Sequence, residues 1–122
     1  MSKTISFADI VQESINFDTA DPAGQLIYSL IDTPWLQRLR DIRQTATTNL
    51  VYMFSEHSRF GHSLGVASMA LNLLNKLEKE HGKQISEYKP AIVAAALLHD
   101  IGHLAPGSHT ATRCWFPGEQ DR

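Results

Sequence analysis

The sequence predicts a chain built mainly from α-helices. A purely apolar run from Ala91 to Leu98 ends abruptly at His99 and Asp100, and its composition is that of a helix buried on all sides. Upstream, apolar residues recur at helical spacing over about residues 58–81, and Gly82 is a typical stop signal. The polar residues that follow the apolar run would then lie at the inner end of a buried helix.

Composition places the chain among ordinary globular domains. It has 122 residues, of which 43% are hydrophobic and 20% are charged, enough for one domain with a real core. The net charge of −2 argues against a basic surface for nucleic acid or acidic lipid. Cys114 is the single cysteine, which excludes an intramolecular disulfide and fits a reducing compartment. We see neither a secretory signal nor a membrane span, so we expect a cytoplasmic protein with no membrane partner.

The first part of the chain is expected to contain a lead-in, a short apolar segment and one helix. Residues 1–24 are predicted to form an irregular or weakly helical lead-in, because Asp, Pro and Gly interrupt them. A short apolar segment follows at 25–31. A helix is then expected over about 34–44, since Pro34 follows a capping side chain and apolar residues recur behind it. We expect Trp35 in the core.

The arginines of this helix, Arg38, Arg40 and Arg43, are expected on a solvated face, although such residues also serve subunit or nucleotide contacts. Residues 45–56 allow either a short strand or a packed loop. The last helix is expected to be capped by Ser86, with Pro90 in its first turn.

Three side chains are candidates for one metal site. His62 lies at the start of the long helix, and His99 with Asp100 lies at the end of the apolar one. Nitrogen and oxygen donors suit a divalent transition metal better than calcium, and the absence of thiolates in this set argues against a zinc finger. The alternative is that His62 and His99 are ordinary helix-end residues and Asp100 forms a salt bridge. His57 and His81 are expected to be exposed helix-end residues without a role.

Three ordered blocks of sequence resemble a known family. They are RFGHSLGV at residues 59–66, LHDIGH at 98–103, which places His99 37 positions after His62, and IDTPWLQRLRDIRQ at 31–44. The first two resemble the HD-domain metal-dependent phosphohydrolase superfamily. The third resembles its branch of deoxynucleoside triphosphate triphosphohydrolases. The resemblance runs from about residue 25 to about 109.

This resemblance implies an all-α fold, an HD-domain helical bundle, with one divalent ion in its site. Carried over by position, His62, His99 and Asp100 would be metal ligands, joined by an aspartate from a later helix. The ion would be manganese, iron, magnesium, zinc or nickel. The chain ends at Arg122, before the region where the family supplies that fourth ligand, so we expect a domain truncated at its C-terminus.

The resemblance also implies roles for four further residues. Arg59 would contact the triphosphate, Gln44 would bind the deoxyribose, and His103 would lie beside the phosphates as a catalytic residue. His109 would be a second catalytic histidine, one position out of register with the family. The residues after Gln44 depart from the family's Gln-Leu-Gly, which affects selection against a ribose 2′-hydroxyl. Asp121 is not expected to be a ligand, because no helix is expected to carry it inward.

The expected domain layout is a lead-in at 1–24, an HD domain at 25–112 and a polar tail at 113–122. The implied function is hydrolysis of deoxynucleoside triphosphates to deoxynucleoside and tripolyphosphate by metal-activated water. One alternative is a catalytically inactive HD fragment that binds metal or nucleotide weakly or acts through association. Another is an HD hydrolase of a different phosphorylated nucleotide. The expected partners are a nucleotide substrate and further copies of the same chain.

Overall fold

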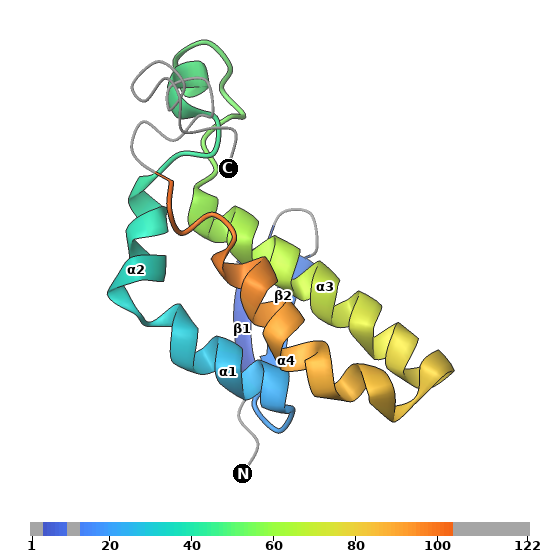
Figure 1. The fold of residues 1–122 in the computed structure, drawn as a ribbon. Helices are drawn as coiled ribbons and strands as arrows, with labels where there is room; N and C mark the ends of the chain where they lie inside the picture. Colours follow the sequence, from blue (N-terminus) through green and yellow to red (C-terminus); the bar gives the residue numbers. More distant parts are fainter. Residues whose placement is uncertain (1–3, 10–12, 104–122) are drawn as a thin grey trace, which may run out of the picture.

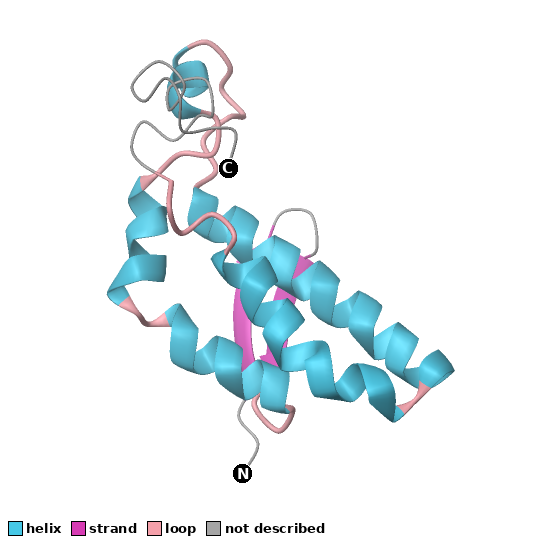
Figure 2. Cartoon of the chain, in the orientation of Figure 1, coloured by secondary structure: helices cyan, strands magenta, loops and turns pink. Residues whose placement is uncertain are grey.

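The computed structural model describes residues 4–9 and 13–103, and these form a helical bundle with a small β-hairpin (Figures 1 and 2). The all-α prediction is confirmed, apart from that hairpin. None of the described helices is both long enough and apolar enough to cross a membrane. The elements in chain order are β1 (Thr4–Asp9), β2 (Glu13–Asp18), α1 (Pro22–Ile31), α2 (Pro34–Gln37), η1 (Arg38–Asp41), η2 (Ala46–Leu50), α3 (Arg59–His81) and α4 (Lys83–Leu98).

A hairpin of two helices, α3 and α4, forms the centre of the bundle (Figure 1). The chain reverses at Gly82, whose φ of +74° lies in the left-handed region that glycine adopts readily. The predicted apolar stripe of α3 is buried at Leu64, Ala67, Leu71 and Leu74, and these residues share one core cluster with α4. The long helix therefore begins and ends close to where the sequence predicts.

The apolar run of α4 is buried on one face only. Val93 and Leu97 are fully buried, whereas Ile92 is 46% exposed and Ala91 and Ala95 are exposed. The prediction of a helix buried on all sides is therefore wrong for the described chain. In Figure 1, α4 lies between α1 and α3, and its contacts with these two helices cover one side of it.

The start of α4 also differs from the prediction. The helix begins at Lys83, directly after the reversal at Gly82, so Ser86 and Pro90 lie in its interior. Pro90 has no N–H to donate to the carbonyl of Ser86, so α4 lacks one of its own hydrogen bonds there. The Ser86 hydroxyl does not cap the helix but donates to the carboxylate of Glu78 on α3.

The expected irregular lead-in contains an antiparallel β-hairpin. Thr4 pairs with Asp18 and Ile5 with Phe17. On β2 the side chains alternate, since Ile15 and Phe17 are buried while the residues between and beside them are exposed. Only two residues of that strand carry the apolar half of this alternation, which is why the sequence signal was too short to be recognised. The hairpin packs its buried face on the helices, with β2 contacting α1 and α3.

The first helix begins earlier than the apolar segment predicted at 25–31. Asp21 accepts a hydrogen bond from the backbone N–H of Ala23 at 3.2 Å, and Pro22 is the first helical residue. Gly24 lies so close to β2 that a Cβ atom there would stand 2.0 Å from the carbonyl oxygen of Asp18. A glycine at this position therefore allows the helix to begin directly against the end of the strand.

The helix predicted at 34–44 is shorter than expected. It consists of α2 and the 3-10 turn η1, and the chain is extended at Ile42. Leu36, Leu39 and Ile42 are buried as the stripe predicts, but Trp35 is 69% exposed, so its placement in the core was wrong. Trp35 is adjacent to Leu36 in the chain, and adjacent helical side chains point about 100° apart.

A short antiparallel bridge follows, and it fixes the start of α3. The Arg59 N–H donates to the carbonyl of Ile42 at 2.8 Å, and the Gln44 N–H donates to the carbonyl of His57 at 3.1 Å. Between the two sides of this bridge, residues 45–56 form η2 and turns rather than a strand. The apolar residues 50–54 of this loop are exposed, so the loop is less packed than expected.

A buried lysine connects three helices away from the histidines. The Lys89 ammonium group on α4 lies 2.6 Å from Asp21 Oδ2 at the start of α1 and 3.4 Å from Glu78 Oε2 on α3. Burial would lower the pKa of Lys89, but the two carboxylates raise it. The hydrogen bond from Ser86 and then that from Lys89 lower the pKa of Glu78.

We predict that Phe17→Ala lowers the free energy of unfolding by about 3–5 kcal/mol, because it removes a fully buried aromatic ring. Phe54→Ala is a matched control, since the Phe54 side chain is 93% exposed, and we expect it to change stability by less than about 0.5 kcal/mol. Urea unfolding followed by circular dichroism measures both. Equal effects of the two variants would show that the hairpin is not part of the core.

We also predict a dependence of stability on acidic pH that Glu78 contributes. Because the folded pKa of Glu78 lies below its ordinary value of 4.5, its stabilising contribution is complete above that pH and is lost as the pH falls through the folded pKa. Glu78→Gln should therefore lower the melting temperature at neutral pH and make its decline on acidification less steep. Glu87→Gln, at an exposed position on α4, is the control. Identical acid profiles for the wild type and Glu78→Gln would contradict this account.

Candidate metal centre

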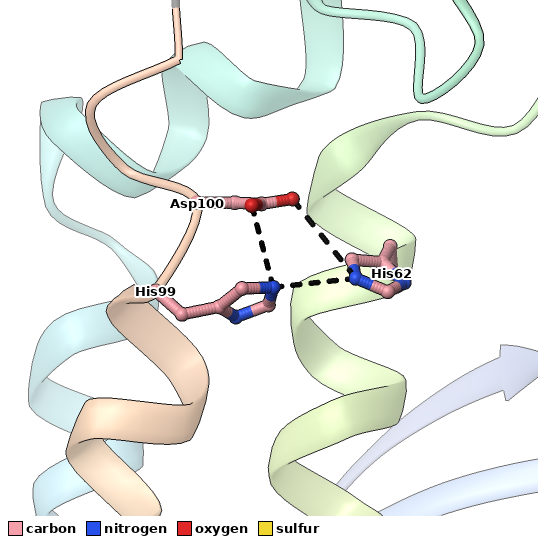
Figure 3. A group of neighbouring side chains, drawn as sticks. All are labelled: His62, His99 and Asp100. Atoms are coloured by element: carbon pink, nitrogen blue, oxygen red, sulfur yellow. Dashed lines mark hydrogen bonds and ion pairs between the residues drawn. The ribbon is translucent and has the colours of Figure 1, made fainter. Parts of the chain in front are cut away.

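His62, His99 and Asp100 meet where the start of α3 faces the end of α4 (Figure 3). The Nε2 atoms of His62 and His99 are 3.3 Å apart. Asp100 Oδ1 lies 3.3 Å from His99 Nε2, and Asp100 Oδ2 lies 4.0 Å from His62 Nε2. The structure therefore brings together the three residues that the sequence suggested as metal ligands.

Two local features place these side chains. Ser58 caps α3 by accepting a hydrogen bond from the Gly61 N–H at 3.4 Å, and His62 follows in the first turn. At the other end, α4 finishes at Leu98 and the backbone turns, with the Ile101 N–H donating to the Leu98 carbonyl at 3.0 Å. This turn allows two consecutive residues, His99 and Asp100, to approach the same point, which a regular helix would prevent.

A hydrogen bond between His99 and α4 determines which nitrogen of the His99 ring carries the proton. Its Nδ1 atom lies 2.8 Å from the carbonyl oxygen of Ala96, and a carbonyl can only accept a hydrogen bond. Nδ1 therefore carries the proton, and in the neutral ring Nε2 has a free electron pair that faces His62 and Asp100. A ring fixed by a hydrogen bond from its other nitrogen is the usual arrangement of a metal-binding histidine.

The donor set fits a divalent cation. Burial lowers the pKa of His62, and the nearby His99 and Arg59 lower it further against the opposing effect of Asp100, so the ring is neutral at physiological pH. The two imidazole Nε2 atoms and the carboxylate oxygens of Asp100 converge over distances of 3.3–4.0 Å. A divalent cation between them would accept an electron pair from each of the three side chains. Nitrogen and oxygen ligands together are typical of manganese, iron, zinc and related ions.

Arg59 holds the carboxylate of this cluster in place. Its Nη1 atom donates to Asp100 Oδ2 at 2.6 Å, and both side chains are buried, Arg59 with 2% of its surface exposed. Burial would raise the pKa of Asp100, but the hydrogen bond and charge of Arg59, helped by His99 and His103, keep it below its usual value. Asp100 is therefore ionised at neutral pH and available as a ligand.

The remaining predicted site residues lie at different places. His103 belongs to the cluster, since its Nε2 atom is 3.3 Å from Asp100 Oδ1. Gln44 lies in the bridge beside His57, and its side-chain oxygen is buried without a hydrogen-bond partner among the described residues. His109 lies outside the described residues, as do Asp121 and the polar tail. His57 and His81 are exposed as expected.

The sequence interpretation missed one arginine that supports the candidate site. Arg38 was expected on a solvated face, but its Nη2 atom donates to the carbonyls of Ile101 and His103. No sequence signal indicates this pairing, because the acceptors are backbone carbonyls more than 60 residues away. Arg40 is exposed, as predicted, and its guanidinium stacks over the ring of Phe60, with Cζ 3.8 Å from the ring centre. Arg43 is exposed, as predicted.

Comparison with known proteins assigns the family. The family model for the HD domain matches residues 59–119, half of the chain, and this span contains His62, His99 and Asp100. The chain belongs to the HD-domain family. The recognition made from the three sequence blocks is thereby confirmed.

Similar proteins share this domain over part of their length. The uncharacterized protein YwfO of Bacillus subtilis (strain 168) is 39% identical over 97 residues, which are 80% of this chain and 22% of that protein. The human deoxynucleoside triphosphate triphosphohydrolase SAMHD1 is 45% identical over 86 residues, 69% of this chain and 14% of that protein. A solved phosphohydrolase from Bacteroides thetaiotaomicron superposes with a TM-score of 0.72 at 35% identity, covering 83% of this chain and 24% of that one. The chain spans about a fifth of the length of the first curated relatives.

We predict that Arg59→Met destabilises the metal-free domain by about 3–5 kcal/mol, because it leaves the Asp100 carboxylate buried without its partner. Adding Asp100→Asn to this variant should restore part of the loss, since the uncompensated charge disappears. Arg43→Met, at an exposed arginine, should change stability by less than about 0.5 kcal/mol. Urea unfolding in EDTA measures all three. Additive effects of the Arg59 and Asp100 substitutions would contradict a direct interaction.

Proposed function

We propose that this chain carries the metal centre of a phosphohydrolase that acts on deoxynucleoside triphosphates and releases deoxynucleoside and tripolyphosphate. The observation that supports it best is the convergence of His62, His99 and Asp100, with the His99 tautomer fixed for metal binding. Membership of the HD-domain family supports the reaction type. The similarity to SAMHD1 and the block at residues 31–44 support the substrate class.

His62, His99 and Asp100 would hold the ion, and an ion with so few protein ligands would keep positions for water and substrate, as catalytic metal sites do. When bound, the divalent ion supplies an acidified water as nucleophile and positive charge for the phosphate oxygens. His99 donates through Nδ1 to the Ala96 carbonyl and thereby keeps Nε2 directed into the site. Asp100 stays ionised because Arg59 holds it.

We assign three further roles to the residues around the ligands. His103, beside Asp100, donates a proton to the leaving oxygen through its imidazole. The Nη1 atom of Arg59 is already bound to Asp100, so Arg59 contributes to phosphate binding through its positive charge beside the cluster rather than through a hydrogen bond from Nη1. The buried side-chain oxygen of Gln44 accepts a hydrogen bond from a sugar hydroxyl. A homo-oligomer remains a prediction.

The experiment is hydrolysis by the purified protein after treatment with EDTA and addition of Mn²⁺, with products separated by ion-exchange chromatography. We expect release of deoxynucleoside and tripolyphosphate from dGTP or dTTP only after Mn²⁺ is added. His103→Ala should reduce kcat by about 10²–10⁴-fold at unchanged metal content, as expected for loss of a general acid. His81→Ala, at an exposed histidine, is the matched control.

Different results would contradict the proposed substrate class and the proposed reaction type. Release of orthophosphate from a nucleoside monophosphate, or cleavage of a cyclic dinucleotide, without action on triphosphates would contradict the substrate class. Hydrolysis that persists in EDTA, or its absence with every substrate after metal loading, would contradict the metal-dependent reaction itself.

A further inference from the structure

Arg38 binds the backbone of the turn that carries the metal ligands. Its Nη2 atom donates to the carbonyl oxygen of Ile101 at 2.7 Å and to that of His103 at 2.8 Å. These carbonyls lie on either side of Gly102, in the segment 99–103, which we call the metal turn. In Figure 1 the metal turn, drawn in orange to red after α4, passes beside the segment that follows α2.

The segment that carries Arg38 is itself anchored. Arg38 is the first residue of η1, and Leu36 and Leu39 on either side of it are fully buried. The side-chain amide of Gln37 also donates to the carbonyl of Ile31 at 2.8 Å, which ties the segment to the end of α1. The guanidinium therefore extends from a fixed base, and its hydrogen bonds can restrain the turn rather than follow it.

Within the described residues, the metal turn has two backbone hydrogen bonds of its own. The Ile101 N–H donates to Leu98 and the His103 N–H donates to Asp100, at 3.0 and 3.1 Å. The carbonyls of Ile101 and His103 lie beyond the end of α4 and need donors from outside that helix. Arg38 supplies them, and its positive charge is favourable near the C-terminus of a helix.

We propose that Arg38 is a positioning residue of the metal centre, which holds the metal turn in the conformation that directs Asp100 and His103 towards His62 and His99. This inference rests on the proposed function for the role of the metal, but the contacts themselves involve only this chain. Arg59 holds the side chain of Asp100 and Arg38 holds the backbone around it. Because the two arginines come from different elements and restrain both the side chain and the backbone, Asp100 is oriented before an ion binds.

An arginine suits this task better than a lysine. A terminal guanidinium nitrogen carries two hydrogens in a fixed plane, so one atom can serve two carbonyls at a defined angle. An ammonium group offers three rotating donors on a flexible stem and defines that angle less well. Arg38→Lys should therefore restore only part of what Arg38→Met removes.

The first test uses the metal-free protein in EDTA and hydrogen exchange of backbone amides measured by NMR. Arg38→Met should accelerate exchange of the His103 amide by about tenfold or more, because the turn loses two hydrogen bonds. Amides in the middle of α3 should exchange at the wild-type rate. Arg43→Met is the matched control, since Arg43 is exposed on the same stretch of chain. An unchanged exchange rate at His103 would overturn the proposal.

The second test is titration with Co²⁺, followed by its visible absorption. Arg38→Met should weaken Co²⁺ binding by about 10–100-fold and alter the absorption band, as expected for loss of a group that orients a ligand. Arg38→Lys should recover part of the affinity, and Arg43→Met should match the wild type. Co²⁺ binding and absorption equal to the wild type in folded Arg38→Met would overturn the proposal.

Two other outcomes are decisive. If Arg38→Met and Arg38→Lys both fail to fold, Arg38 supports the whole domain rather than the metal turn, and the proposal is wrong. If the wild type itself does not bind Co²⁺, the metal centre of the proposed function is contradicted. The hydrogen-exchange result alone then decides whether Arg38 restrains the metal turn.

Discussion

The buried ion pair between Arg59 and Asp100 is the interaction on which the proposed metal centre depends. It joins the first residue of α3 to the turn after α4, and both side chains are almost inaccessible to water. His62 follows Arg59 by three residues and His99 directly precedes Asp100, so the same pair sets how closely the two imidazoles approach. It also keeps Asp100 ionised despite its burial. The Arg59–Asp100 ion pair thus determines both the position of the proposed ligands and the ionised state of Asp100.

The rest of the described fold holds these two helix ends in register. The core between α3 and α4 fixes the two helices against each other. The N-terminal part contributes support rather than proposed metal ligands: the Ile42 carbonyl receives the Arg59 N–H, Phe7 packs edge-on against Phe60 with ring centres 6.3 Å apart, and Arg38 binds the metal turn. The β-hairpin, which adds Ile15 and Phe17 to the core, thereby contributes to the site from a distance.

The sequence allowed the site to be predicted better than the periphery of the fold. The long helix was predictable because its stripe repeats many times and Gly82 ends it, and the cluster was predictable because its three residues belong to distinctive blocks. The β-hairpin was not predictable, since a two-stranded sheet leaves only Ile15 and Phe17 as buried alternating positions on β2. The composition of α4 did not show which of its faces is exposed, because alanine-rich sequence is compatible with either environment. The hydrogen bonds of Arg38 were not predictable, because their acceptors are main-chain atoms that any sequence possesses.

The measurement that tests the central claim most directly is the metal content of the purified chain by elemental analysis, compared between the wild type and His99→Ala. The account predicts a stoichiometric divalent transition metal in the wild type and in His81→Ala, and its loss in His99→Ala, because His99 directs its free Nε2 electron pair into the site. The same metal content in His99→Ala as in the wild type, or no bound metal in the wild type after equilibration with Mn²⁺, Fe²⁺ or Zn²⁺, would contradict it.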